Sequence, residues 1–167
     1  MNKLTLAIML LFTTAFAMAQ PRLPENYFWK KLSNGLEVVV IENHKVPLAT
    51  IEIAVRNGAY TEGAEYSGLS HLFEHMFFKA NRDYPDQEKF LNRTQELGAI
   101  WNGTTGDERV NYFFTFDKDS LSAGLHFMNS AIRFPIYRTE DMQKERPVVD
   151  GEFQRGESDP GFQIWYE

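Results

Sequence analysis

The spacing of hydrophobic and polar residues predicts which parts of the chain form strands. Residues 48–55 alternate, with Ile51, Ile53 and Val55 on one face, as expected of a half-buried strand. Ser33-Asn34-Gly35 separates two further apolar runs, and Asn and Gly favour a tight hairpin turn. The sequence therefore predicts strands over residues 27–31, 36–42, 48–55, 100–105 and 109–116.

Other segments carry apolar residues at helical spacing. We predict helices over residues 67–79, 86–97, 119–133 and 139–155. Ser67 is a plausible N-cap for the first of these helices, and Gly98 and Pro135 follow the second and third. The order of strands, two helices, two strands and two helices predicts an α+β fold, with helices packed on a largely antiparallel sheet.

The first 19 residues form a separate segment. Lys3 precedes an apolar run from Leu4 to Ala17, and Ala17-Met18-Ala19 resembles a signal-peptidase site. A membrane anchor is the alternative, but a run of about 14 residues is shorter than the roughly 20 that a spanning helix needs. We predict a signal peptide over residues 1–19, one exported domain over residues 20–167, and no membrane span after cleavage. A bacterial periplasm or the exterior is the expected location.

Composition narrows the chemistry. Hydrophobic residues make up 43% of the chain and there are 14 Phe, enough for a packed core rather than a disordered chain. The formal charge of −6 argues against a nucleic-acid partner, which would favour a basic surface. Without cysteine, thiol catalysis and thiolate metal sites are excluded, so any metal would be held by His, Asp or Glu.

One pentapeptide, His71-Leu72-Phe73-Glu74-His75, combines these residue types. Histidines at positions i and i+4 of a helix point the same way, and their imidazoles can share one zinc ion. Glu74 lies beside His75, where a carboxylate can take a proton from a water that attacks a carbonyl. The alternative is a pair of histidines that only pack and hydrogen-bond in an amphipathic helix.

A third ligand would come from elsewhere in the chain. Glu145 and Glu152 are seven residues apart, which places both on one face of the last helix. One could bind the metal while the other orients a histidine by a hydrogen bond. Exposed glutamates are common, and the same helix also carries Glu140, Asp141, Asp150 and Glu157, so spacing alone does not choose among them.

The sequence resembles the pitrilysin-type zinc metallopeptidases, the M16 family or inverzincins, whose signature is His-x-x-Glu-His. The similarity runs from about residue 32 to residue 163, nearly all of the mature chain, and would make the chain an N-terminal peptidase domain of a secreted bacterial member. The matching segments, in chain order, are Asn34-Gly35-Leu36, Gly58, Glu62, Gly68-Leu69-Ser70, His71 to Lys79, Glu96-Leu97-Gly98-Ala99, Asn102-Gly103-Thr104-Thr105, Tyr112, Glu145-Arg146, Val148-Val149 and Glu152.

The resemblance implies a role for each matched position. His71, His75 and Glu152 would bind zinc; 76 residues separate His75 from Glu152, as in the family. Glu74 would be the general base of a zinc-dependent endopeptidase. Glu145 would be a carboxylate near the site that does not bind the metal itself. Asn102 and Gly103 would bind an extended peptide or unfolded polypeptide by edge-strand addition. A homologous second half or subunit would complete the chamber.

Some features depart from this pattern. Pro147 falls inside the last predicted helix, and if the helix instead began there, Glu145 would leave the helical face. The chain is much shorter than family members and ends in an apolar segment, so we expect a fragment that binds zinc weakly and cleaves slowly or not at all. The alternative function is a non-catalytic subunit or peptide-binding module of the same fold that works with a partner chain.

Overall fold

The computed structural model of the chain describes residues 23–158 and residue 161. The predicted signal peptide lies outside the described residues. Two compact units divide between Val46 and Pro47. In the first, β1 (Tyr27–Lys31) pairs antiparallel with β2 (Glu37–Ile41). Gly35 has a φ of 88°, so the predicted hairpin and the glycine in its turn are confirmed.

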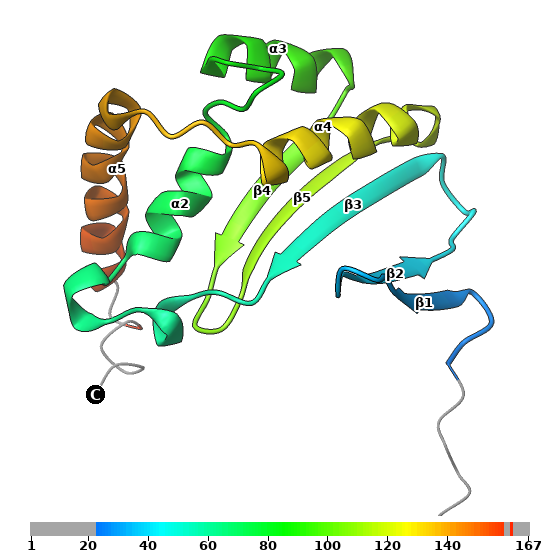
Figure 1. The fold of residues 1–167 in the computed structure, drawn as a ribbon, viewed down its shortest axis with the longest axis horizontal. Coiled ribbons are helices and arrows are strands. Elements are labelled where there is room, and N and C mark those ends of the chain that lie inside the picture. Colours follow the sequence, from blue (N-terminus) through cyan, green and yellow to red (C-terminus); the bar gives the residue numbers. More distant parts are fainter. Residues whose placement is uncertain (1–22, 159–160, 162–167) are drawn as a thin grey trace, which may run out of the picture. The chain divides into compact units, whose positions relative to one another are not determined.

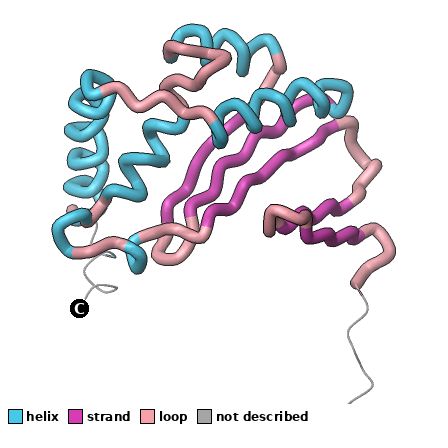
Figure 2. Tube along the Cα trace, in the orientation of Figure 1, coloured by secondary structure: helices cyan, strands magenta, loops and turns pink. Residues whose placement is uncertain are grey.

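The second unit contains a three-stranded antiparallel sheet in the order β3-β5-β4. Its strands are β3 (Leu48–Val55), β4 (Ile100–Thr105) and β5 (Val110–Asp117), which lie side by side in Figures 1 and 2. All three were predicted to within one residue at each end. Because β5 is central, β3 and β4 are the edge strands of this sheet.

The hydrophobic core lies between one face of this sheet and the helices (Figure 1). Alternate residues of β5 point into it, and all four of them are buried: Val110, Tyr112, Phe114 and Phe116. Helix α4 (Leu121–Arg133) packs on β5 and β3, while α2 (Leu69–Phe77) packs on β4 and β5. Helix α3 (Gln87–Glu96) contributes Phe90, whose side chain is fully buried. The predicted α+β fold, with helices on an antiparallel sheet, is confirmed.

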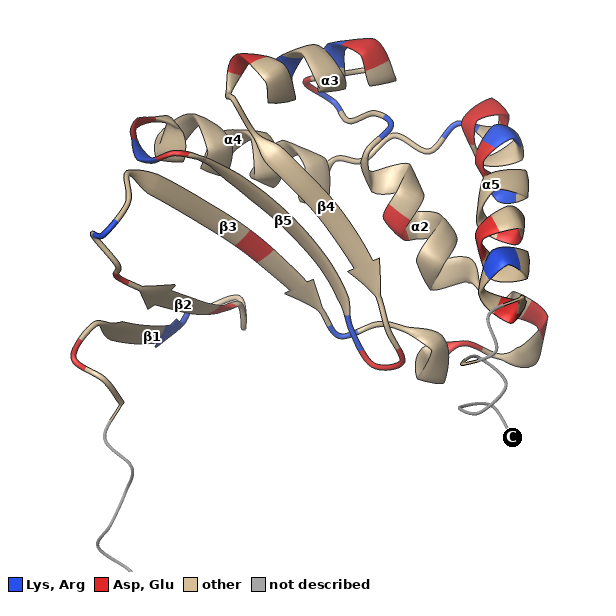
Figure 3. Cartoon of the chain, turned by 180° about the vertical axis from the view of Figure 1, so that it is seen from behind, with Lys and Arg blue, Asp and Glu red and all other residues tan. Residues whose placement is uncertain are grey.

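Helix α5 (Thr139–Glu157) packs against α2 and carries charged residues of both signs along its length (Figure 3). It is continuous through Pro147 and does not begin there. Proline removes one backbone hydrogen bond, but Pro147 and Gln143, four residues earlier, are both exposed, so water can bind the freed carbonyl. Glu145 and Glu152 consequently share one uninterrupted helix.

The segment before α2 differs from the sequence prediction. Short 3-10 turns, Ala59–Thr61 and Ala64–Tyr66, precede a helix that begins at Leu69. Gly68, with a φ of 86°, occupies the N-cap position, so the predicted N-cap role of Ser67 is wrong. Across the residues that the structure describes, no helix is long and apolar enough to cross a membrane.

Candidate metal centre

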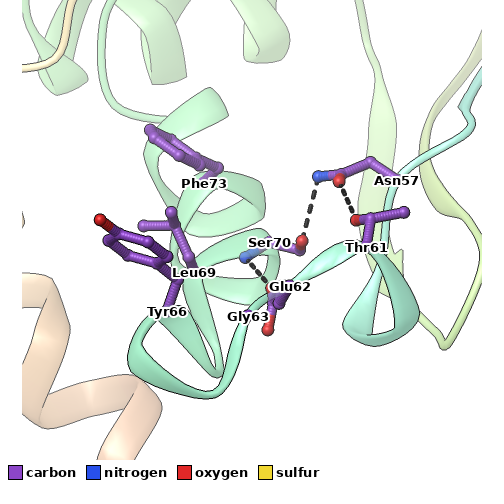
Figure 4. A pocket seen from close by; sticks show the side chains of 8 residues that line it. All are labelled: Asn57, Thr61, Glu62, Gly63, Tyr66, Leu69, Ser70 and Phe73. Carbon is purple, nitrogen blue, oxygen red and sulfur yellow. Dashed lines mark hydrogen bonds between the residues drawn. The ribbon is translucent and has the colours of Figure 1, made fainter.

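The N-terminus of α2 is held by a carboxylate from outside the helix. Glu62 accepts hydrogen bonds from the backbone N–H groups of Gly68 and Ser70, at 2.7 and 2.6 Å. Figure 4 shows the bond from Ser70. Burial alone would raise the pKa of Glu62, but the hydrogen bonds from Ser70 and Gly68 outweigh it and hold that pKa below its ordinary value. A negative charge at this end of the helix also complements the helix dipole. Glu62 therefore does what Ser67 was expected to do.

A shallow pocket of about 230 Å³ lies beside this cap (Figure 4). One side of it is polar, where Asn57 donates a hydrogen bond to Ser70 and Thr61 donates one to Asn57. The other side is formed by Tyr66, Leu69 and Phe73. None of the predicted site residues lines this pocket.

His71 and His75 lie one turn apart on α2, with ring centroids 4.7 Å apart. Their Nε2 atoms are 3.1 Å from each other. Oε2 of Glu152, on α5, lies 3.4 Å from Nε2 of His71 and 3.5 Å from Nε2 of His75. The packing of α5 on α2 thus brings Glu152 to the two histidines, and the three side chains form a group that could hold a metal ion.

These three atoms suit a tetrahedral ion. Ligands at about 2.0–2.1 Å from zinc in a tetrahedral arrangement are separated from each other by about 3.3 Å. The observed separations of 3.1, 3.4 and 3.5 Å lie close to that value. The distances to Glu152 are longer than those of ordinary N–H···O hydrogen bonds. Two imidazoles and one carboxylate are also a donor set that zinc prefers, so the residues fit a zinc ion.

Glu145 lies behind His75. Its Oε1 is 3.1 Å from Nδ1 of His75, and its Oε2 is 2.6 Å from Nζ of Lys79. Burial alone would raise the pKa of Glu145, but the contacts with Lys79 and His75 lower it, so the carboxyl is ionised. When Nδ1 of His75 donates its proton to Glu145, Nε2 keeps the lone pair that a metal requires.

Glu74 points to the sheet. Its side chain is buried, and its Oε2 accepts a 2.8 Å hydrogen bond from the hydroxyl of Thr105 on β4. Gly103 is so close that a Cβ there would lie 2.4 Å from Oε1 of Glu74. The pKa of Tyr112, across the strand pair, is raised by burial first and then by Tyr137 and the charge of Glu74. The carboxylate therefore lies in a confined space between α2 and β4.

Asn102 and Gly103 lie on β4 with opposite orientations. Asn102 is exposed, and its Oδ1 accepts a 2.9 Å hydrogen bond from the N–H of Gly103. Gly103 lies on the inner side, next to Glu74. Both belong to an edge strand whose outer backbone groups are available for pairing. Substrate binding by these two residues stays a prediction.

Sequence reasoning missed the contacts of three residues. Glu62, Lys79 and Thr105 occur in the matched motifs, but no role followed from the sequence for any of them. Ser70, the partner of Glu62, lies eight residues away, across the loop before α2. Glu145 and Glu74, the partners of Lys79 and Thr105, are distant from them in sequence. Of these three residues, only Lys79 offered a signal in the sequence, because its positive charge follows the predicted metal-site pentapeptide closely and could pair with a carboxylate there.

Fold and site together define a class: α+β proteins with an inverted His-x-x-Glu-His helix and a glutamate from a later helix at the same point. Comparison with known proteins agrees. Residues 37–163 match the family described as insulinase (peptidase family M16), and the chain belongs to this family.

Individual relatives extend this result. The chain is 30% identical over 126 residues to an insulin-degrading enzyme homolog of Dictyostelium discoideum, covering 75% of this chain and 13% of that protein. It is 27% identical over 136 residues to an uncharacterized zinc protease of Rickettsia felis, covering 81% of this chain and 33% of that protein. A crystal structure of a protease from Helicobacter pylori shares the fold, with a TM-score of 0.76 and 22% identity, over 86% of this chain and 34% of that one. The chain thus spans between 13% and 34% of the length of these three proteins.

Proposed function

We propose that the chain is the zinc-binding part of an endopeptidase that hydrolyses peptide bonds, with Glu74 as general base. The observation that supports this most directly is the convergence of His71, His75 and Glu152 within 4.8 Å of one another. Glu74 is on the same helix, next to one of these ligands. Names of relatives such as the zinc protease of Rickettsia felis support the same reading.

Each residue would have a distinct task in this reaction. Bound zinc would lower the pKa of a coordinated water and polarise the scissile carbonyl. Glu74 would take the proton of the attacking water through its carboxylate and then pass it to the leaving amine. Glu145 would keep Nε2 of His75 unprotonated and correctly directed, because it accepts the proton of Nδ1.

The substrate would be an extended peptide or an unfolded polypeptide. Edge strand β4 offers backbone donors and acceptors for a further strand, and it runs past Glu74. Asn102 and Gly103 would contact the substrate backbone at this edge. A homologous second half or subunit would cover the other side of the peptide, which agrees with the greater length of the relatives.

Location is a separate proposal that rests on residues 1–19 alone. Lys3, the apolar run that follows and Ala17-Met18-Ala19 support export from a bacterial cell. Sequencing the N-terminus of the protein purified from its host tests this directly. Processing before Gln20 would support it, and a mature protein that begins at Met1 would contradict it.

The catalytic proposal is tested by Glu74→Gln in the complete protein. Amide and carboxylate have nearly the same shape, so zinc content measured by mass spectrometry should stay at the wild-type level. Cleavage of an unstructured fluorogenic peptide should fall by about 100-fold or more, because the general base is lost. Glu88→Gln, on the exposed surface of α3, is the matched control.

The alternative, a non-catalytic subunit or peptide-binding module, makes the opposite forecast for this experiment. Such a protein would bind zinc and peptide but would not need a carboxylate at position 74. No cleavage by either the wild type or Glu74→Gln would favour that alternative, whereas equal cleavage by both would remove Glu74 from the mechanism.

A further inference from the structure

The general base proposed above is itself held by the neighbouring strand. Thr105 is the last residue of β4, and its hydroxyl donates a 2.8 Å hydrogen bond to Oε2 of Glu74. The two residues are 31 positions apart, so the contact exists only because α2 packs on β4.

A glutamate side chain needs such a restraint. It has three rotatable bonds, and proton transfer requires one oxygen to stay within hydrogen-bond reach of the attacking water. The hydroxyl of Thr105 donates a hydrogen bond to Oε2 of Glu74. The backbone of Gly103 lies close to the rest of the carboxylate: a Cβ at position 103 would be 2.4 Å from Oε1 and 2.8 Å from the carboxyl carbon of Glu74. One oxygen is thus tied by a hydrogen bond and the other lies in the space that a side chain at position 103 would take.

We infer that Thr105 is a positioning residue: its hydroxyl holds the carboxylate of Glu74 in the orientation from which it accepts the proton of water. This inference rests on the proposed peptidase function. A hydroxyl that donates to a carboxylate forms a charge-assisted hydrogen bond, which is stronger than a bond between neutral groups. Glu74 is 8% exposed, so solvent has little access to replace the lost donor.

The hydroxyl is not needed for the sheet. Thr105 lies opposite Val110 of β5 in the antiparallel ladder, which is held by backbone hydrogen bonds and not by the side chain of Thr105. Valine has the shape of threonine and favours strands, so Thr105→Val removes the donor and preserves the ladder. Serine keeps the donor and removes a methyl group. The two variants separate the effect of the hydrogen bond from that of side-chain packing.

The test compares Thr105→Val and Thr105→Ser with the wild type in the complete zinc-loaded protein. We expect kcat of Thr105→Val on an unstructured peptide to fall by roughly 10- to 100-fold, since part of the general-base contribution is lost. KM should change by less than about twofold, because substrate binding does not use this hydroxyl. Thr105→Ser should retain kcat to within about threefold.

Thr50→Val is the matched control. It removes another threonine hydroxyl from the same sheet, one that forms a 2.8 Å hydrogen bond with the hydroxyl of Thr115. Its kcat should equal that of the wild type. A crystal structure of metal-free Thr105→Val gives a readout independent of activity: the carboxylate of Glu74 should leave its place beside Gly103. In the zinc-loaded preparations, the zinc content of Thr105→Val should equal that of the wild type.

The outcomes separate this inference from the function it depends on. If Glu74→Gln abolishes cleavage but Thr105→Val keeps the wild-type kcat, the inference is wrong and the proposed function stands. If Thr105→Ser loses as much kcat as Thr105→Val, or if Thr50→Val does, the hydroxyl has no specific role and the inference is also wrong. If Glu74→Gln remains fully active, both are wrong. Should Thr105→Val not fold, Thr105→Ala replaces it in the same comparison.

Discussion

At the candidate metal centre, Lys79 affects His75 indirectly, through Glu145. Lys79 contacts one oxygen of Glu145 at 2.6 Å, and the other oxygen of Glu145 contacts Nδ1 of His75 at 3.1 Å. The side chains of Lys79 and Glu145 are only 17% and 12% exposed, so solvent screens their charges poorly. Lys79 therefore holds the carboxylate that contacts His75, one of the three residues proposed to bind zinc.

We expect Lys79→Met to weaken zinc binding. Without the ammonium group the pKa of Glu145 rises and its carboxylate loses one anchor, so His75 is less well oriented. Loss of such a supporting partner typically lowers metal affinity by about 10- to 100-fold. Titration of the protein with zinc against a competing chelator measures the change.

Lys89→Met is the control for this prediction. Lys89 pairs with Asp86 at 3.4 Å, but its side chain is 63% exposed and lies on α3. Its removal should leave zinc affinity at the wild-type value. Equal zinc affinity of Lys79→Met and the wild type would show that Glu145 is held in place without Lys79.

At the scale of an element, α2 depends on groups that lie outside it. Gly68 occupies the N-cap position in a left-handed conformation, and Glu62 accepts hydrogen bonds from two backbone N–H groups at this end of the helix. In α4, Gly124 allows a close approach to β5, because a Cβ there would lie 2.2 Å from the ring of Phe116. These contacts determine where α2 begins and how closely α4 packs on β5. The hydrophobic periodicity of the two helices does not predict them.

The cap on α2 predicts a pH-dependent stability. The pKa of Glu62 is below 4.5 in the folded protein, so the ionised carboxylate stabilises the fold above about pH 4.5, and this contribution is lost as the pH falls toward the folded pKa. Glu62→Gln should lower the free energy of unfolding at pH 7 by about 1 kcal/mol, the usual cost of a lost helix cap. It should also make the acid side of the stability curve shallower.

Urea unfolding between pH 3 and pH 7 measures this effect. Glu65→Gln, at an exposed position of the same loop, should reproduce the wild-type curve. A Glu62→Gln protein with an unchanged pH dependence would contradict the assignment of Glu62 as the cap.

At the scale of the whole molecule, the decisive feature is that this chain corresponds to only a small part of its relatives. It covers 13% of the Dictyostelium discoideum relative and 33% of the Rickettsia felis relative. In the proposed reaction, the edge of β4 would contact the peptide on one side only, whereas efficient hydrolysis would require the substrate to be held in one geometry at Glu74.

The 167-residue chain expressed alone should therefore bind zinc weakly and cleave an unstructured peptide roughly 100-fold or more slowly than the complete protein. Zinc content and kcat/KM, compared between the two preparations, give the answer. Rapid proteolysis by the isolated chain would show that one half suffices.

Within the described residues, the sequence by itself determined the strands, most of the helix bounds, the fold class and the pair of histidines at positions 71 and 75, because each depends on short-range periodicity and local spacing. It missed the 3-10 turns before α2 and the residue at which α2 begins. It did not choose among the acidic residues of the last helix without the family resemblance. Only the tertiary structure decided that Glu152 lies beside the two imidazoles, that α5 continues through Pro147, and that Thr105 reaches Glu74. Such contacts depend on how α2, α5 and β4 pack. Packing brings together residues that are far apart in the sequence, and the hydrophobic periodicity of the sequence does not predict which of them meet.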